Sequence, residues 1–341
     1  MKVKREHTAN ATRPPDECPD KIFAIGTVEV APLCGILTVM TARALIAVAL
    51  LFSAPVFAQT PDTASAKAQV LAADRALAAS AARNGAAVFL RELQPGAAVL
   101  FPGQPILKGA DGSRPAFLAR YGGQSSYSWT PAHAVVSADG KLACTMGYSR
   151  FVNALDSVKS AKSGTYLTCW LKNKKGEWKV AGAQRADSPP KGSPFADSAV
   201  LPGAPHSPVA SSGSNALAAA QEADSLFAMM GAEAAGPGPA FAKYAAEDGM
   251  LVGGDEFPRG PQVIAAAFKD YSPDRVIWWR PSREFGAGTG GLAFTVGNST
   301  SGPRAGKTGP TIANKYFTVW RQEPDGRWLY IFDLGSSRPL N

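Results

Sequence analysis

The stretch Tyr166-Leu-Thr-Cys-Trp170 returns 150 residues later as Tyr316-Phe-Thr-Val-Trp320, and each copy is followed six residues on by a Gly-x-Trp sequence. The same spacing links a set of thirteen residue pairs, and six of the seven tryptophans belong to it. The pairs are Asp74 and Asp224, Tyr121 and Tyr271, Trp129 and Trp279, Pro131 and Pro281, Gly140 and Gly290, Ala143 and Ala293, Thr145 and Thr295, Gly147 and Gly297, Tyr166 and Tyr316, Thr168 and Thr318, Trp170 and Trp320, Gly176 and Gly326, and Trp178 and Trp328. A period this long exceeds the roughly 20 to 50 residues of solenoid and propeller repeats, so each copy is expected to bury its own core. The sequence therefore predicts a duplicated domain.

Within each copy, helical patterns come first and strand patterns follow. Apolar residues at helical spacing surround Asp74 in one copy and Asp224 in the other, so each first helix carries a carboxylate on its apolar face. Further helices are expected near 86–93, 113–121, 239–246 and 260–271, and strands over 99–101, 127–131, 142–147, 164–171, 176–180, 250–252, 276–281, 292–297, 315–320 and 327–332. This order predicts the α+β class, with helices packed on one face of an antiparallel sheet.

The region before the first copy has the pattern of an export signal. Arg43 precedes nine apolar residues, and Ala58 ends a short segment of the kind that signal peptidase cleaves. We expect a signal peptide over 40–58, cleavage before Gln59 and a periplasmic or secreted bacterial protein. Residues 1–39 are interpreted as a mis-called start or a disordered extension. The apolar run is shorter than the roughly 20 residues that cross a bilayer, so no membrane span is expected after cleavage.

A segment rich in proline, serine and glycine separates the two copies. Residues 188–214 contain six prolines and no apolar period, which is typical of an interdomain linker. The expected domains are therefore 59–187 and 215–341.

Composition excludes several classes of function. The formal net charge of +8 falls only to +7 after cleavage and is spread thinly along the chain, so no nucleic-acid partner is expected. Only His133 and His206 remain after cleavage, which argues against a histidine-based catalytic triad or metal site. Cys144 and Cys169 are the remaining cysteines, and in an oxidising compartment they form either a cross-strand disulfide or a reduced buried pair.

Five motifs in the same order in both copies resemble the nuclear transport factor 2-like superfamily, in particular its DUF4440 and SnoaL-like branch. They are an Asp in the first helix, a Gly before the third helix, Trp-x-Pro, Tyr-x-x-x-Trp and Gly-x-Trp: Asp74, Gly109, Trp129 to Pro131, Tyr166 to Trp170 and Gly176 to Trp178, then Asp224, Gly260, Trp279 to Pro281, Tyr316 to Trp320 and Gly326 to Trp328. The resemblance implies two tandem cones, each a strongly curved sheet wrapped around helices with a cavity at its open end. It also implies that the two domains pair within the chain as a pseudo-dimer.

The candidate site residues follow from this cone. A carboxylate on an inner helical face must be hydrogen-bonded, paired or placed in a pocket, so Asp74 and Asp224 are candidate general bases or, alternatively, structural groups bonded to a backbone NH or to Trp or Tyr donors. Asp333 lies in the last strand, where the resembling family often has an acidic residue, but the first copy has Ala183 there. The expected ligand-binding residues are Trp129, Tyr166, Trp279 and Tyr316.

Three functions remain open at the level of sequence, because a fold does not decide a function. One is binding of a small apolar or amphipathic molecule. A second is a cofactor-independent isomerase or hydrolase in which Asp224 is the base, assisted by Tyr316 or Asp333. A third is a structural or interaction module whose cavities are filled by side chains. No cofactor and no metal ion is expected.

Overall fold

The structure, a computed structural model, describes residues 62–123, 125–152, 161–186, 205–208, 215–253 and 257–340. The predicted segments 1–39 and 40–58 lie outside the described residues, as does the predicted linker 188–214 apart from 205–208. We refer to residues 62–186 as domain 1 and to 215–340 as domain 2.

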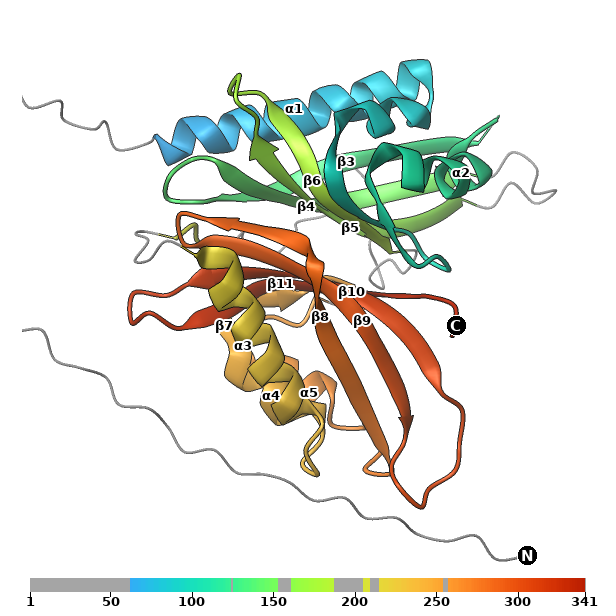
Figure 1. The fold of residues 1–341 in the computed structure, drawn as a ribbon, viewed down its shortest axis with the longest axis vertical. Coiled ribbons are helices and arrows are strands. Elements are labelled where there is room, and N and C mark those ends of the chain that lie inside the picture. The colour runs from blue at the N-terminus through green and yellow to red at the C-terminus, as the bar shows by residue number, and fades with distance from the viewer. Residues whose placement is uncertain are drawn as a thin grey trace, which may run out of the picture. The chain divides into compact units, whose positions relative to one another are not determined.

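Domain 1 is a six-stranded sheet with helices on one face (Figure 1). Its elements are α1 Thr63–Asn84, a 3-10 helix over Ala86–Glu92, β1 Leu93–Leu100, β2 Ile106–Lys108, α2 Gly109–Tyr121, β3 Ser126–Val136, β4 Leu142–Val152, β5 Ala161–Lys172 and β6 Trp178–Ala186. The strand order is β2-β1-β6-β5-β4-β3. Asp62 caps α1 by accepting a hydrogen bond from the Ser65 backbone NH at 3.0 Å.

Domain 2 repeats the arrangement with five strands in the order β7-β11-β10-β9-β8 (Figure 1). Its elements are α3 Ala216–Gly231, α4 Pro237–Tyr244, β7 Ala245–Leu251, α5 Pro261–Ala267, β8 Arg275–Thr289, β9 Leu292–Pro303, β10 Ile312–Gln322 and β11 Trp328–Ser337. Asn215 caps α3 as Asp62 caps α1, through the Ala218 backbone NH. In place of the β1–β2 hairpin, Met250 forms an isolated bridge with Arg259.

The predicted α+β class, with N-terminal helices packed on a curved sheet in each of two tandem domains, is confirmed. Several boundaries differ by some residues from expectation, among them α4 and α5, which end at Tyr244 and Ala267 and not near 246 and 271. The first strand of each domain pairs parallel with the last, β1 with β6 and β7 with β11, so only the remaining pairs are antiparallel. The third helix of domain 1 begins at Gly109 and not at Ser113. Gly109 has a φ of 58° and lies so close to the Pro95 carbonyl oxygen that a side chain would clash, so this position requires glycine.

The two sheets share one hydrophobic cluster, to which Leu100, Leu167, Phe294 and Phe317 belong. Gly182 permits this contact, because a Cβ atom there would lie 2.7 Å from the Phe294 ring and 2.8 Å from the Phe317 ring. Polar contacts surround the cluster. They are the Ala138 NH to the Gly290 carbonyl at 2.8 Å, the Thr289 hydroxyl to Asp139 at 2.5 Å, the Lys108–Glu284 ion pair at 2.9 Å and the Lys315 ammonium to the Phe101 carbonyl at 2.6 Å.

Residues 205–208, within the predicted linker, contact both domains. The Ser207 hydroxyl accepts a hydrogen bond from the Val136 NH at 3.0 Å, and the His206 NH donates to Asp248 at 2.7 Å. Asp248 also forms a buried ion pair with Arg321 at 2.9 Å. This short piece is therefore anchored and does not behave as free coil.

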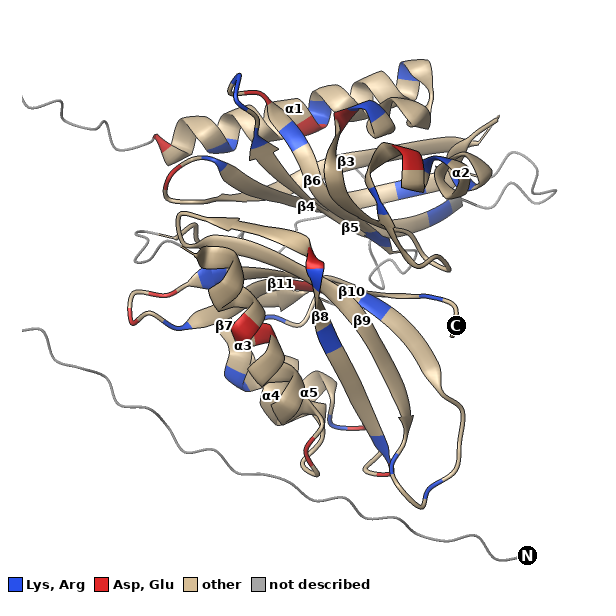
Figure 2. Ribbon diagram, in the orientation of Figure 1, with Lys and Arg blue, Asp and Glu red and all other residues tan. Residues whose placement is uncertain are grey.

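Charged side chains are dispersed over the elements of both domains (Figure 2). No helix within the described ranges is long and apolar enough to cross a membrane.

Candidate functional site

The centre of domain 2 is a hydrogen-bonded network around Asp224. Helix α3 directs this side chain into the sheet, where it is 1% exposed. One carboxylate oxygen accepts from the Trp279 indole at 3.2 Å, and the other accepts from the Thr295 hydroxyl at 2.7 Å and from the Tyr316 hydroxyl at 3.0 Å. Burial raises the pKa of Asp224 to about 7, against the three donors, which lower it. The carboxylate thus holds β8, β9 and β10 together and has little free acceptor capacity.

Domain 1 contains the same network around Asp74. The Trp129 indole donates to one oxygen at 2.7 Å and the Tyr166 hydroxyl to the other at 2.8 Å. Burial raises the pKa of Asp74, while the charge of Arg185 is among the causes that lower it. In both domains a deeper tryptophan donates to the network threonine, Trp170 to Thr145 at 3.0 Å and Trp320 to Thr295 at 2.8 Å.

The repeated glycine on β9 makes room for this arrangement. A Cβ atom at Gly297 would lie 2.1 Å from the Arg280 carbonyl oxygen and 2.5 Å from the Tyr316 hydroxyl. The missing side chain therefore lets the Tyr316 hydroxyl reach Asp224. A Cβ atom at Gly147 would likewise lie 2.1 Å from the Thr130 carbonyl oxygen, so close approach of the neighbouring strand is the reason that the two glycines share.

Beside the Asp224 network, domain 2 has a cavity of about 340 Å³. Aromatic and aliphatic side chains provide much of its wall, and seven polar side chains line it from β9, β10 and β11. The lining residues are Phe227, Phe241, Ile277, Trp279, Ser299, Ser301, Asn314, Tyr316, Thr318, Asp333, Gly335 and Ser336. This volume is within the usual range of small-molecule sites, which are concave and largely apolar with few polar groups.

Asp333 is the acidic side chain that faces the cavity most directly. One of its oxygens accepts a hydrogen bond from the Thr318 hydroxyl at 2.5 Å. No described side chain or backbone NH donates to its other oxygen. Burial raises the pKa of Asp333 to about 6, and Asp333 in turn is one of the causes that raise the pKa of Asp224. Asp224 lies behind Tyr316 and Trp279 and is not among the lining residues.

The corresponding space in domain 1 is filled by larger side chains. The strand register places Tyr127 opposite Phe151, where domain 2 has Ile277 opposite Ser301. Arg185 pairs with Tyr166, where domain 2 has Gly335 paired with Tyr316. Arg185 is only 3% exposed, and its guanidinium carbon lies 4.7 Å from the centre of the Tyr166 ring.

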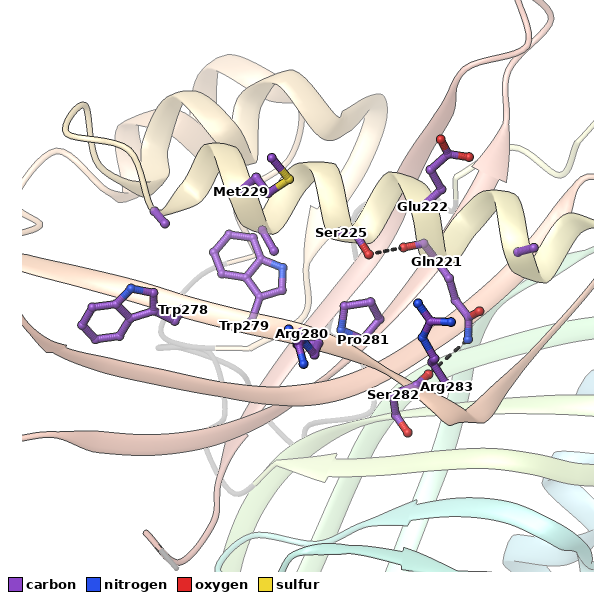
Figure 3. A pocket seen from close by; sticks show the side chains of 13 residues that line it. Gln221, Glu222, Ser225, Met229, Trp278, Trp279, Arg280, Pro281, Ser282 and Arg283 are labelled. Atoms are coloured by element: carbon purple, nitrogen blue, oxygen red, sulfur yellow. Dashed lines mark hydrogen bonds between the residues drawn. The ribbon is translucent and has the colours of Figure 1, made fainter. Parts of the chain in front are cut away.

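A larger groove of about 1090 Å³ lies between α3 and β8 (Figure 3). Trp279 forms part of this groove as well as of the cavity, so one indole separates the two spaces. The groove is bordered by charged and exposed groups such as Glu222, Arg280 and Arg283, and Met229 is 70% exposed. A ligand there would keep much of its surface in water, so the smaller aromatic cavity is the better candidate for a specific site.

The structure brings the sequence-predicted residues into two groups. Trp279, Tyr316 and Asp333 meet at the open cavity of domain 2, with Asp224 behind them. Trp129, Tyr166 and Asp74 are buried beneath the filled space of domain 1. Sequence reasoning missed Thr295, Gly335 and Arg185. Thr295 was visible as a repeated residue, whereas the other two occupy positions where the copies differ.

Cys144 and Cys169 are register partners on β4 and β5 and are joined by a disulfide. Phe294 and Val319 form the corresponding pair in domain 2. Both cysteines are fully buried in the cluster that the two sheets share. Among the described residues, no group of three or more His, Cys, Asp or Glu side chains is placed to hold a metal ion.

No protein-family model and no curated protein sequence matches the chain. Solved structures do match, each over about one domain. A ketosteroid isomerase-like protein from Erwinia carotovora atroseptica is 16% identical with a TM-score of 0.31, and the match covers 36% of this chain and 95% of that one. A nuclear transport factor 2-like protein with a cystatin-like fold from Novosphingobium aromaticivorans is 16% identical with a TM-score of 0.30, and the match covers 35% of this chain and 80% of that one. A nuclear transport factor 2-like superfamily protein from Salmonella enterica is 13% identical with a TM-score of 0.31, and the match covers 37% of this chain and 92% of that one.

Proposed function

We propose that this chain is an exported tandem protein of the nuclear transport factor 2-like, DUF4440-type family that binds a small apolar or amphipathic molecule in the cavity of domain 2. The observation that carries the proposal is the cavity itself, where Phe227, Phe241 and Trp279 form an aromatic part of the wall and polar side chains line the rest. Burying an apolar ligand against these rings supplies the main driving force, and the polar groups set its orientation.

Domain 1 serves as the partner of this domain in the proposal. The space inside the cone of domain 1 is occupied by side chains of that domain, so we interpret domain 1 as a structural module. The cluster shared by the two sheets supports an intramolecular pseudo-dimer in which domain 1 covers the outer face of the domain 2 sheet. The disulfide between Cys144 and Cys169 fits an oxidising compartment outside the cytoplasm, in agreement with the predicted export signal.

A fluorescence titration tests the binding function. N-phenyl-1-naphthylamine is a neutral aromatic probe of suitable size, and we expect its emission to rise on binding to the full chain. Ser301→Phe should weaken this binding at least about tenfold, because it introduces the side chain that domain 1 carries at the same register position. The variant should fold, since Phe151 packs edge-on against Tyr121 at 5.3 Å and domain 2 has Tyr271 at the matching place.

Thr300→Phe is the matched control, because Thr300 is next to Ser301 on β9 and is not among the residues that line the cavity. Equal loss of binding in both variants, or no binding to the unmodified chain, would contradict a site in this cavity.

An enzyme is the second candidate, and Asp333 favours it. This carboxylate faces the cavity with one oxygen to which no described residue donates, and its pKa of about 6 suits a general base near neutral pH. The reaction would be a cofactor-independent isomerisation or hydrolysis, with Asp333 taking the proton, Tyr316 on the cavity wall nearby and Asp224 behind Tyr316. Asp333→Asn should abolish turnover of a substrate that still binds, whereas a pure binding protein shows no turnover to lose.

A further inference from the structure

The cones of the two domains differ most at one register position. Tyr166 pairs with Arg185 across β5 and β6, and Tyr316 pairs with Gly335 across β10 and β11. The two tyrosines have the same role, since each donates its hydroxyl to the carboxylate of the first helix. A cationic side chain is therefore present in one cone and missing from the same place in the other.

Arg185 lies in an aromatic cage. Its guanidinium carbon is 4.7 Å from the centre of the Tyr166 ring, 5.2 Å from that of Phe89 and 5.9 Å from those of Tyr127 and Trp129. One guanidinium nitrogen donates to the Leu167 and Gln184 carbonyls and to the Thr168 hydroxyl, at 3.1 to 3.3 Å. Cations over aromatic faces are attracted by the ring quadrupole, more strongly when they are removed from water. Domain 1 thus shows that this cone accommodates a planar cation.

Domain 2 keeps three of the four rings of this cage and lacks the cation, and Ile277 stands at the register position of Tyr127. Tyr316 and Trp279 correspond to Tyr166 and Trp129, and Phe241 faces Trp279 with ring centres 5.9 Å apart, as Phe89 faces Trp129 at 6.3 Å. The Thr318 hydroxyl, which corresponds to Thr168, also lines the cavity. Gly335 leaves open space, because nothing lies within 4 Å of a Cβ atom placed there.

The cavity of domain 2 has a carboxylate that the cone of domain 1 lacks, and a carboxylate is complementary to a cation. Asp333 stands on the wall where domain 1 has Ala183, and the lining contains no lysine, arginine or histidine. Two arginines bond to lining residues and not to Asp333: Arg275 donates to the Ser301 carbonyl and hydroxyl, and Arg338 donates to the Asn314 carbonyl. A carboxylate in an apolar wall is costly unless a cation or several donors compensate it, and Asp333 receives one donor from the described residues.

We propose that the cavity of domain 2 binds a small organic cation, a guanidinium or ammonium group on an apolar body, in the position that Arg185 occupies within domain 1. The cation lies among Tyr316, Trp279 and Phe241 and donates to the free oxygen of Asp333. The apolar body contacts Phe227 and Ile277. This inference rests on the proposed ligand-binding function and specifies the ligand class.

Calorimetric titration of the full chain with benzamidine and benzamide tests the charge requirement. The two probes share a planar shape and differ in the cationic group. We expect benzamidine to bind at least about tenfold more tightly, as a charge-assisted hydrogen bond to Asp333 implies. In Asp333→Asn, which keeps the shape of the side chain, this preference should fall to less than about twofold.

Gly335→Arg offers an independent test, because it supplies domain 2 with the cation that domain 1 already has. Benzamidine binding should be lost in this variant. Thr308→Arg, an equal charge on an exposed loop outside the cavity, should bind benzamidine as the unmodified chain does. Circular dichroism confirms that each variant is folded.

The outcomes separate this inference from the proposed function. Equal binding of benzamide and benzamidine, with no effect of Asp333→Asn, would overturn the proposal that the ligand is a cation. Binding of N-phenyl-1-naphthylamine would still support the cavity as a ligand site. Failure of all three probes to bind would overturn both.

Discussion

The two domains of this chain share a framework and differ in what that framework encloses. Each has a carboxylate on its first helix that accepts hydrogen bonds from a tryptophan and a tyrosine, and each has a deeper tryptophan bonded to a buried threonine. Within this common frame, domain 1 is filled by Tyr127, Phe151 and Arg185, whereas domain 2 has smaller side chains and a cavity. Repeated residues therefore build the cone, and unrepeated residues decide whether it is open.

The largest expected effects are at the shared framework and should be equal in the two domains. Trp170 and Trp320 are almost fully buried, so Trp170→Ala and Trp320→Ala should each lower the unfolding free energy by about 3 to 5 kcal/mol. Urea unfolding measures both. A loss of unfolding free energy in only one of the two variants would contradict a common framework.

Asp224 of domain 2 should make stability depend on pH. The pKa of Asp224 is raised from 3.8 to about 7 on folding, so between these values the folded chain is protonated where the unfolded chain is ionised. Stability from this group is therefore present at low pH and falls by up to about 4 kcal/mol as pH rises from about 4 to about 7. Asp224→Asn should flatten this decline in urea unfolding measured across that range. An unchanged slope in the variant would assign the pH dependence to other groups.

The disulfide is a stabilising element of domain 1 alone. Its 25-residue sequence separation implies a contribution of about 3 kcal/mol through restriction of the unfolded chain. Dithiothreitol should therefore lower the melting temperature of the unmodified protein. A variant with alanine at both Cys144 and Cys169 should melt at the same temperature with and without reductant. A drop in that variant as well would show that the reductant acts elsewhere.

A smaller difference is expected between the two buried carboxylates at pH 7. Asp74→Asn removes the negative charge near the buried Arg185 and should cost about 2 to 3 kcal/mol. Asp224→Asn also places an amide NH2 against buried donors, but it relieves repulsion with Asp333, so it should cost only about 1 kcal/mol. Denaturant unfolding of the two variants side by side provides the comparison, and equal losses would mean that Arg185 does not depend on Asp74.

Sequence patterns predicted the class of fold and the helical position of both carboxylates. Helical spacing alone placed Asp74 and Asp224 on inner faces, and both are 1% exposed. Strand ends were less predictable. The expected strand over 276–281 extends to Thr289 in β8, because pairing with β9 continues past the bulge after Pro281 where the alternation is lost.

The cavity could not be predicted in the same way. The positions that open it, such as Ser301 and Gly335, do not match between the copies, so a search for repeated residues passes over them. Their meaning depends on the register, which shows that they occupy the places of Phe151 and Arg185. A glycine in a strand gives no sign by itself that it replaces a buried cation.

The most direct test of the difference between the domains is the indole NH signals of Trp129 and Trp279 in a nitrogen-15 NMR titration of the full chain with benzamidine. Trp279 lines the open cavity, and Trp129 lies beneath Arg185. Single Trp→Phe variants assign the two signals. The structure predicts that the Trp279 signal shifts with increasing benzamidine while the Trp129 signal stays in place. A shift of both signals, or of Trp129 alone, would contradict the assignment of the open site to domain 2.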